Sequence, residues 1–279
     1  MLRRLVHGIS RLPWGFLKGL AWVLAGVLTY VVRYRAGVVR DNLARCFPHH
    51  PEAWRKKVAH DFYKHFAMVL VESLKTLSMK KEDLIRRVLV DNPEFFKNFR
   101  DKGVSGLLLG AHMGNWEWAG IRGSHLTGMT NLAVYFHLKN PEADQVMNKT
   151  RRRLSNVGFV VSPKNLYKTL LQAPKPCWTY IIADQSPDRE HHVRTLFLGQ
   201  DTAFYDGPPR LARRLNLAVA YVHAQRLGFG RHKIRFELLA EDVSSLTDQE
   251  VMARFAQRLE NDIRQHPEQW LWSHRRWKF

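Results

Sequence analysis

The sequence predicts an α/β protein with a mixed sheet flanked by helices, behind a helical N-terminal region. Two observations predict this class. From residue 103 onward, short apolar runs alternate with amphipathic stretches, which is the pattern of strands connected by helices. Before that point, apolar positions recur at helical spacing. With 279 residues, of which 45% are hydrophobic, the chain is long enough to bury a substantial core.

The first segment contains the longest apolar run, from Leu12 to Val32, with Lys18 as its only charge. Arginines flank this run on both sides. We interpret residues 1–40 as an uncleaved membrane anchor with basic flanks, which either spans the bilayer or lies in its interface. A small-residue cleavage site is missing, which argues against a signal peptide. A buried core helix remains the alternative.

Residues 41–102 are expected to form the helical part of a single domain that covers 41–279. A short helix is predicted over Asp41–Pro48, where the proline ends it. A long amphipathic helix is predicted over Pro51–Met79. A third helix is predicted over Asn92–Arg100, because Asn is a good N-cap and a proline follows at the first helical position.

Residues 103–279 are expected to form the α/β core, with alternating strands and helices. The expected strands are Val104–Gly110, Leu132–Phe136, Gly158–Val161, Cys177–Ala183, Leu217–Val222 and Ile234–Leu238. The expected helices are Asn115–Leu126, Pro141–Leu154, Lys164–Gln172, Gly207–Leu215 and Asp248–Gln265.

One stretch of this core carries a candidate for chemistry, Gly106–Gly120, which reads GLLLGAHMGNWEWAG. His112 follows the first strand of the core, at the carboxyl end where α/β sheets bind ligands. Gly114 permits a tight turn, and Asn115 is a good N-cap for the next helix. Glu117 then falls in the first helical turn, where the helix dipole favours an ionised carboxylate.

This arrangement suits general base catalysis. A carboxylate on one imidazole nitrogen fixes the tautomer and leaves the other nitrogen free to take a proton. A substrate hydroxyl activated by His112 could attack an acyl carbonyl directly, without a serine nucleophile. The bland alternative is a turn histidine and a nearby carboxylate that serve stability alone. The spacing of a histidine and a glutamate five positions apart does not by itself distinguish a catalytic pair from a structural one.

His112–Glu117 (HMGNWE) resembles the HX4(D/E) motif of glycerolipid-type acyltransferases. The wider chain resembles the bacterial lipid A biosynthesis acyltransferase family, the late lauroyl and myristoyl transferases. The other segments that carry the likeness are Tyr34–Pro48, Phe62–Leu74, Ala183–Gln185, Gly207–Arg213 and His266–Lys278. The resemblance implies a glycerolipid-acyltransferase-like fold behind an N-terminal anchor helix.

The resemblance also implies an activity and a location. The enzyme would be an O-acyltransferase of lipid A and lipopolysaccharide biosynthesis, in the inner membrane of a Gram-negative bacterium with its catalytic domain facing the cytoplasm. Acyl-acyl carrier protein would be the donor, and a hydroxyl of a lipid A precursor the acceptor. No cofactor and no metal are expected. His112 and Glu117 carry over as the catalytic pair.

Five further residues are candidates for substrate contact. Arg151 and Arg153 close a predicted helix and suit bidentate phosphate binding, although a solvated helix end is the alternative. Asp184 and Gln185 end a strand on the side of His112 if the strands are parallel, although an ordinary turn would explain them as well. Asn115 lies within the motif itself.

The charge indicates a polyanionic partner, because 44 Lys and Arg face 25 Asp and Glu, for a net charge of +19. Nucleic acid is not expected, since no helix-turn-helix, RNA-recognition or zinc pattern is visible. An anionic membrane, a phosphorylated lipid and an acidic carrier protein all fit. A related lysophospholipid or other glycolipid acyltransferase and a basic membrane-bound scaffold stay open as alternatives. The Trp-rich segment 270–278 is compatible with interfacial anchoring, phosphate contact or a structural strand.

Overall fold

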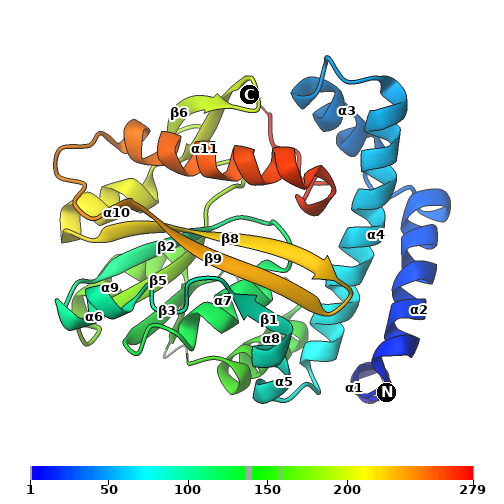
Figure 1. The fold of residues 1–279 in the computed structure, drawn as a ribbon, viewed down its shortest axis with the longest axis horizontal. Coiled ribbons are helices and arrows are strands. Elements are labelled where there is room, and N and C mark those ends of the chain that lie inside the picture. The colour runs from blue at the N-terminus through cyan, green and yellow to red at the C-terminus, as the bar shows by residue number, and fades with distance from the viewer. Residues whose placement is uncertain (1, 136–139, 157–158, 279) are drawn as a thin grey trace.

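The computed structural model describes residues 2–135, 140–156 and 159–278, and in this part of the chain it confirms the predicted α/β class. One mixed seven-stranded sheet runs in the order β1-β9-β8-β2-β5-β3-β4 (Figure 1). Its strands are β1 (Val88–Val90), β2 (Gly106–Gly110), β3 (Thr130–Val134), β4 (Phe159–Val161), β5 (Cys177–Ile182), β8 (Ala218–Gly228) and β9 (Arg231–Ala240). Neighbouring strands are parallel except β8 and β9, which form an antiparallel hairpin.

Strand β2 lies at the centre of the sheet, and all five of its residues are buried. Leu107 and Leu109 face one core cluster, which also contains residues of α11 (Asp248–Gln265). Leu108 faces the other cluster, which contains Trp118 of α7 (Trp116–Ser124). Because both faces are covered, the strand is a continuous apolar run and not an alternating one, as is usual for buried parallel strands.

Helices cover both faces of the sheet, with α11 on one side and α7 and α8 on the other (Figure 1). The helices of the core are α6 (Lys97–Asp101), α7 (Trp116–Ser124), α8 (Pro141–Leu154), α9 (Leu166–Gln172), α10 (Gly207–Leu215) and α11 (Asp248–Gln265). The predicted bounds of α8, α10 and α11 are confirmed. A capping box between Thr247 and Glu250 fixes the start of α11. The predicted strand ends at Phe136 and Gly158 lie outside the described residues.

The N-terminal region is mainly helical, but β1 lies within the range 41–102 that was expected to be helical and belongs to the main sheet. Its helices are α1 (Leu2–Ser10), α2 (Trp14–Gly26), the π-helical turn η1 (Val27–Val31), α3 (Ala36–Cys46), α4 (Glu52–Thr76) and α5 (Lys81–Arg87). Helix α3 begins five residues before the predicted start at Asp41. Helix α2 runs alongside α4 at the edge of the molecule (Figure 1).

Helix α2 and η1 have one buried stripe and one outward apolar face. Leu17, Ala21 and Ala25 form the buried stripe. The outward apolar side chains are Phe16, Trp22, Val23, Tyr30 and Val31, with exposed fractions between 51% and 76%. By length and composition, the 18-residue segment Trp14–Val31 is apolar enough to cross a membrane. The outward face is therefore compatible with a membrane anchor, and it is not the surface of an ordinary core helix.

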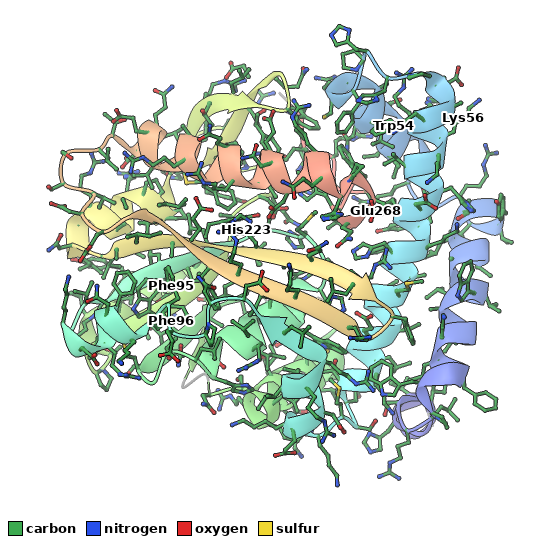
Figure 2. All side chains as sticks on the ribbon, viewed as in Figure 1. Trp54, Lys56, Phe95, Phe96, His223 and Glu268 are labelled. Carbon is green, nitrogen blue, oxygen red and sulfur yellow. The ribbon has the colours of Figure 1, made fainter. Side chains whose placement is uncertain are left out.

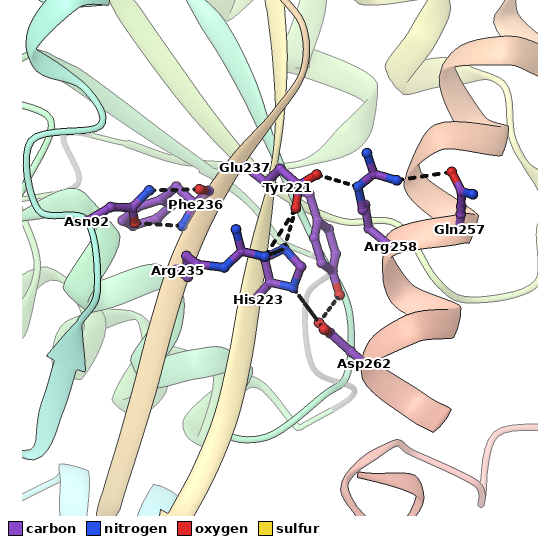
Figure 3. Close-up of polar contacts among 9 residues, drawn as sticks. All are labelled: Asn92, Tyr221, His223, Arg235, Phe236, Glu237, Gln257, Arg258 and Asp262. Carbon is purple, nitrogen blue, oxygen red and sulfur yellow. Dashed lines mark hydrogen bonds and ion pairs between the residues drawn. The ribbon is translucent and has the colours of Figure 1, made fainter. Parts of the chain in front are cut away.

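The helix predicted from Asn92 is wrong in the structure. Turns follow Asn92, and a helix, α6, forms only from Lys97. The Asn92 amide instead pairs with the backbone of Phe236 in β9, donating to its carbonyl at 2.8 Å and accepting from its N–H at 3.0 Å (Figure 3). Phe95 and Phe96 pack against the Phe236 ring beneath the sheet (Figure 2). Both polar atoms of the Asn92 side chain are hydrogen-bonded to β9, so the side chain does not cap a helix.

A second, two-stranded sheet was not predicted. Strand β6 (His192–Phe197) and β7 (Gln200–Tyr205) form an antiparallel hairpin beside α11. Leu198 and Gly199 make the turn with φ values of 52° and 74°. Two positive φ values in a two-residue turn suit the twist of a hairpin. The signal in the sequence was the glycine between two short runs rich in β-branched and aromatic residues.

Candidate active site

The register of two parallel strands places His112 beside Asp184. Gly110 at the end of β2 is level with Ile182 at the end of β5, and each candidate lies two residues further on. The carboxylate of Asp184 accepts from the backbone N–H of His112 at 2.9 Å. Its other oxygen lies 2.7 Å from the Nδ1 atom of the His112 ring. The carboxylate therefore holds both the loop and the ring of the histidine.

Asp184 is almost fully buried, with 3% of its side chain exposed. Burial alone would raise the pKa of Asp184, but the His112 ring and backbone and the indole of Trp270 lower it further than burial raises it. The net shift of the pKa is downward, so the group is ionised near neutral pH. The ionised carboxylate of Asp184 can only accept a hydrogen bond, so the proton of the neutral ring lies on Nδ1. The tautomer with an unprotonated Nε2 is therefore favoured.

The other ring nitrogen of His112, Nε2, belongs to a side chain that is 17% exposed. The Nε2 atom is 3.4 Å from the amide nitrogen of Gln185, a long contact that a substrate could replace. The ring packs edge-on against Trp116, with 4.9 Å between centroids. This nitrogen can accept a proton from a group bound beside it.

A second histidine is held by two carboxylates and provides a contrast. The Nδ1 atom of His223 lies 2.8 Å from Asp262, and its Nε2 atom lies 3.0 Å from Glu237 (Figure 3). Arg258 also pairs with Glu237, and Tyr221 donates to Asp262. This cluster lines a cavity of about 410 Å³ and joins β8, β9 and α11. Because both ring nitrogens are occupied, His223 is suited to cross-linking these elements and not to proton transfer.

The structure does not place Glu117 against the His112 ring, so a catalytic role for Glu117 stays a prediction. Glu117 forms a bidentate ion pair with Arg151 of α8, with N–O distances of 2.8 and 2.6 Å. The orienting carboxylate on the His112 ring is that of Asp184. Spacing along the chain favoured Glu117, whereas the order of the strands brings Asp184 next to His112. The only local signal for Asp184 was its position after a predicted strand.

Asn115 and Arg153 have structural partners in the fold. Asn115 caps α7 by accepting from Trp118 N–H and donates to the buried Glu72 at 2.8 Å. Arg153 donates to backbone carbonyls at the end of α4 and just after it, including that of Thr76 at 2.8 Å. These bonds account for both residues without a ligand, and substrate contact by them remains a prediction.

A small cavity lies between α7, β3, β5 and α8, with Glu117 and Arg151 in its wall. Its volume is about 70 Å³. The ring of Tyr180 limits it from the sheet side, and the Tyr180 hydroxyl donates a hydrogen bond to the carbonyl of Trp116 at 3.1 Å. The ring fits because a neighbouring position is glycine: a Cβ atom on Gly120 would lie 2.5 Å from it.

The C-terminal segment forms a wall of the site. The N–H of Leu271 donates to the carbonyl of His112, and the N–H of Gly114 donates to the carbonyl of Gln269, both at 3.1 Å. Trp270 and Trp272 are buried, with exposed fractions of 2% and 0%. Of the three interpretations open for segment 270–278, the structural one fits these two tryptophans.

The fold and the site together define an α/β protein with a histidine–carboxylate centre at the carboxyl ends of two neighbouring parallel strands. An N-terminal helix with an outward apolar face accompanies this centre. A histidine paired with a carboxylate in this way is able to act as a general base toward a hydroxyl group.

The family model described as bacterial lipid A biosynthesis acyltransferase matches residues 5–279, and the chain belongs to this family. It is therefore a member of an acyltransferase family that acts in lipid A biosynthesis. The chain is 23% identical over 274 residues to the lipid A biosynthesis palmitoleoyltransferase of Escherichia coli (strain K12), covering 96% of this chain and 87% of the relative. It is 26% identical over 278 residues to the lauroyltransferase of the same organism, covering 97% and 88%. The resemblance found in the sequence motifs is confirmed.

Proposed function

We propose that this protein transfers a fatty acyl chain from acyl-acyl carrier protein to a hydroxyl of a lipid A precursor. The single observation that carries the proposal is the His112–Asp184 pair, in which Asp184 holds Nδ1 and leaves the Nε2 atom of a partly exposed ring to take a proton. Family membership supports the reaction class. A related enzyme that acylates a lysophospholipid or another glycolipid would use the same pair and remains the alternative.

In the proposed mechanism, Asp184 accepts the Nδ1–H of His112 throughout. The Nε2 atom of His112 removes the proton of the acceptor hydroxyl as its oxygen attacks the thioester carbonyl. The carbon–sulfur bond then breaks, and the departing thiolate takes the proton from the imidazolium. The products are an ester and a free thiol, and no acyl-enzyme forms. General base catalysis of this kind contributes about 10²–10⁴-fold to a rate.

Glu117 and Arg151 have a different part in the proposal. The side chain of Arg151 is 15% exposed, and its guanidinium is held in one orientation by both oxygens of Glu117. A guanidinium fixed in this way can present its remaining N–H groups to a phosphate or carbonyl oxygen. We assign Arg151 to the polar part of the acceptor, with Glu117 as the residue that positions it.

The proposed location is the cytoplasmic face of the inner membrane. The outward apolar face of α2 and η1 would enter the lipid, and the net charge of +19 suits anionic headgroups. The same basic surface would attract the acidic carrier protein that delivers the acyl chain.

The test is a transfer assay with the purified protein in detergent. Acyl-acyl carrier protein and a tetra-acylated lipid A precursor are incubated with the protein, and mass spectrometry detects the addition of one acyl chain. We expect His112→Ala and Asp184→Asn to lose about 10²–10⁴-fold in rate. Transfer to a lysophospholipid but not to the precursor would reassign the acceptor. A folded protein that transfers to neither acceptor would favour the scaffold alternative.

A further inference from the structure

A third donor meets the carboxylate that orients His112. The indole N–H of Trp270 donates to Asp184 Oδ2 at 2.8 Å, the same oxygen that accepts from the His112 backbone. Trp270 follows α11 and is distant in sequence from both residues.

Trp270 cannot readily turn away from Asp184. Its two neighbours along the chain, Gln269 and Leu271, hydrogen-bond to the loop that carries His112, and Trp270 itself bridges to Met113. Its ring is 2% exposed and packs against other aromatic rings. These are Phe197, Trp272 and Trp277, with centroids 5.8, 4.7 and 6.3 Å away.

The contact has an electrostatic consequence for the histidine. A hydrogen bond to a carboxylate draws negative charge toward the donor, because the charge is delocalised over both oxygens. The oxygen that faces the His112 ring then attracts an imidazolium less strongly. The bond from Trp270 therefore limits how strongly Asp184 stabilises the protonated form of His112 during the reaction.

We propose that Trp270 is a positioning residue of the acyl-transfer reaction, which keeps Asp184 aligned with His112 and moderates the basicity of His112. This inference rests on the proposed function, in which His112 is the general base. It adds to that function a residue that acts on the reaction only through Asp184.

The test is the pH dependence of kcat/KM for the full-length protein and the Trp270→Phe variant. The acidic limb reports the protonation of the free enzyme's base. Loss of the indole donor should move this limb to higher pH by about 0.5 unit, because Asp184 then stabilises the imidazolium more strongly. At a pH above the limb, the rate should fall by less than about tenfold.

Trp272→Phe is the matched control. Trp272 lies in the same aromatic cluster and is equally buried, but its indole donates to the backbone carbonyl of Pro267. The control loses a similar ring volume and one indole hydrogen bond, so its stability loss should be comparable while its acidic limb stays in place.

A second variant removes only the donor. Replacing Trp270 with 3-benzothienylalanine keeps the ring shape and puts sulfur where the N–H was. The same upward shift of the acidic limb is expected. An unshifted limb in both Trp270 variants would overturn the proposal and leave the residue a packing role. Full activity of His112→Ala would instead refute the proposed function itself, whatever the result at Trp270.

Discussion

The buried carboxylate of Glu72 offers a sharp test of how the active-site loop is held. Its side chain is 0% exposed. One oxygen accepts from the N–H of Gly230 at 2.7 Å, and the other accepts from Asn115 at 2.8 Å and lies 2.9 Å from His232. All of the partners are donors, so an acceptor-only group is required at this point.

Glu72→Gln keeps the shape but introduces an NH₂ group that must face at least one of these donors. If the amide oxygen of the new glutamine accepts from Gly230, its NH₂ group faces His232 and Asn115. His232 can change tautomer and accept from this NH₂ group, but the NH₂ group of Asn115 is left facing another donor. One charge-assisted bond is lost and one buried donor is unsatisfied. Together these should lower the free energy of unfolding by about 3 kcal/mol. Since Asn115 caps α7 directly after the His112 loop, activity should fall as well.

The measurement is thermal unfolding in the same detergent. A loss of this size should lower Tm by roughly 5–10 °C in a chain of this length. Lys57→Ala is the control, since it removes an ion pair to Asp61 from a side chain that is 76% exposed. Exposed ion pairs of this kind contribute little to stability. If the Tm of Glu72→Gln lay within about 2 °C of the Tm of the control, the difference in unfolding free energy would be only on the order of 0.5 kcal/mol, and the reasoning would be refuted.

Three further outcomes are expected. Gly120→Ala should destabilise the fold by about 1–3 kcal/mol in thermal unfolding, because the new Cβ atom would lie 2.5 Å from the Tyr180 ring. Gly123→Ala on the same helix is the control: its Cβ atom would meet no atom closer than 3.6 Å, so the substitution should be neutral or slightly stabilising. Burial lowers the pKa of His274 from 6.5 to about 4, and the neutral ring accepts a hydrogen bond from the N–H of Ser186. Between these two pH values the unfolded chain binds more protons than the folded chain, so Tm should fall as the pH drops from 6.5 to 4. The fall should be less steep in His274→Asn, which has no group that titrates in this range. Raising salt should slow transfer at subsaturating carrier protein and leave the saturated rate nearly unchanged, so a salt-independent rate under subsaturating donor would contradict charge-guided docking.

The regular elements of the core could be predicted because their signals are local. Pro141 and the Gly207–Pro208 pair mark helix starts, and the helix from Asp248 follows a threonine cap. The apolar run of β2 identified a buried strand for the same reason. The helix predicted from Asn92 was wrong because the Asn92 side chain hydrogen-bonds to a strand residue 144 positions further along the chain. No local sequence pattern indicates such a contact.

The site was only half accessible to sequence reasoning. His112 was identified from its place after a strand, but its carboxylate partner depends on which strands are neighbours and in what register. Both Asp184 and Glu117 were within the set of candidates, and only the parallel pairing of β2 with β5 separates their contacts. Trp270 was beyond reach, because its indole meets Asp184 through the return of the chain after α11.

That return of the chain sets an order of events during synthesis. The loop that carries His112 is bonded to Gln269 and Leu271, whereas α2 with its apolar face comes near the beginning of the chain. Translation delivers α2 before the segment around Trp270. Under the proposed membrane location, α2 could reach the lipid while His112 still lacks the wall formed by Gln269 and Leu271, so membrane contact would precede completion of the site.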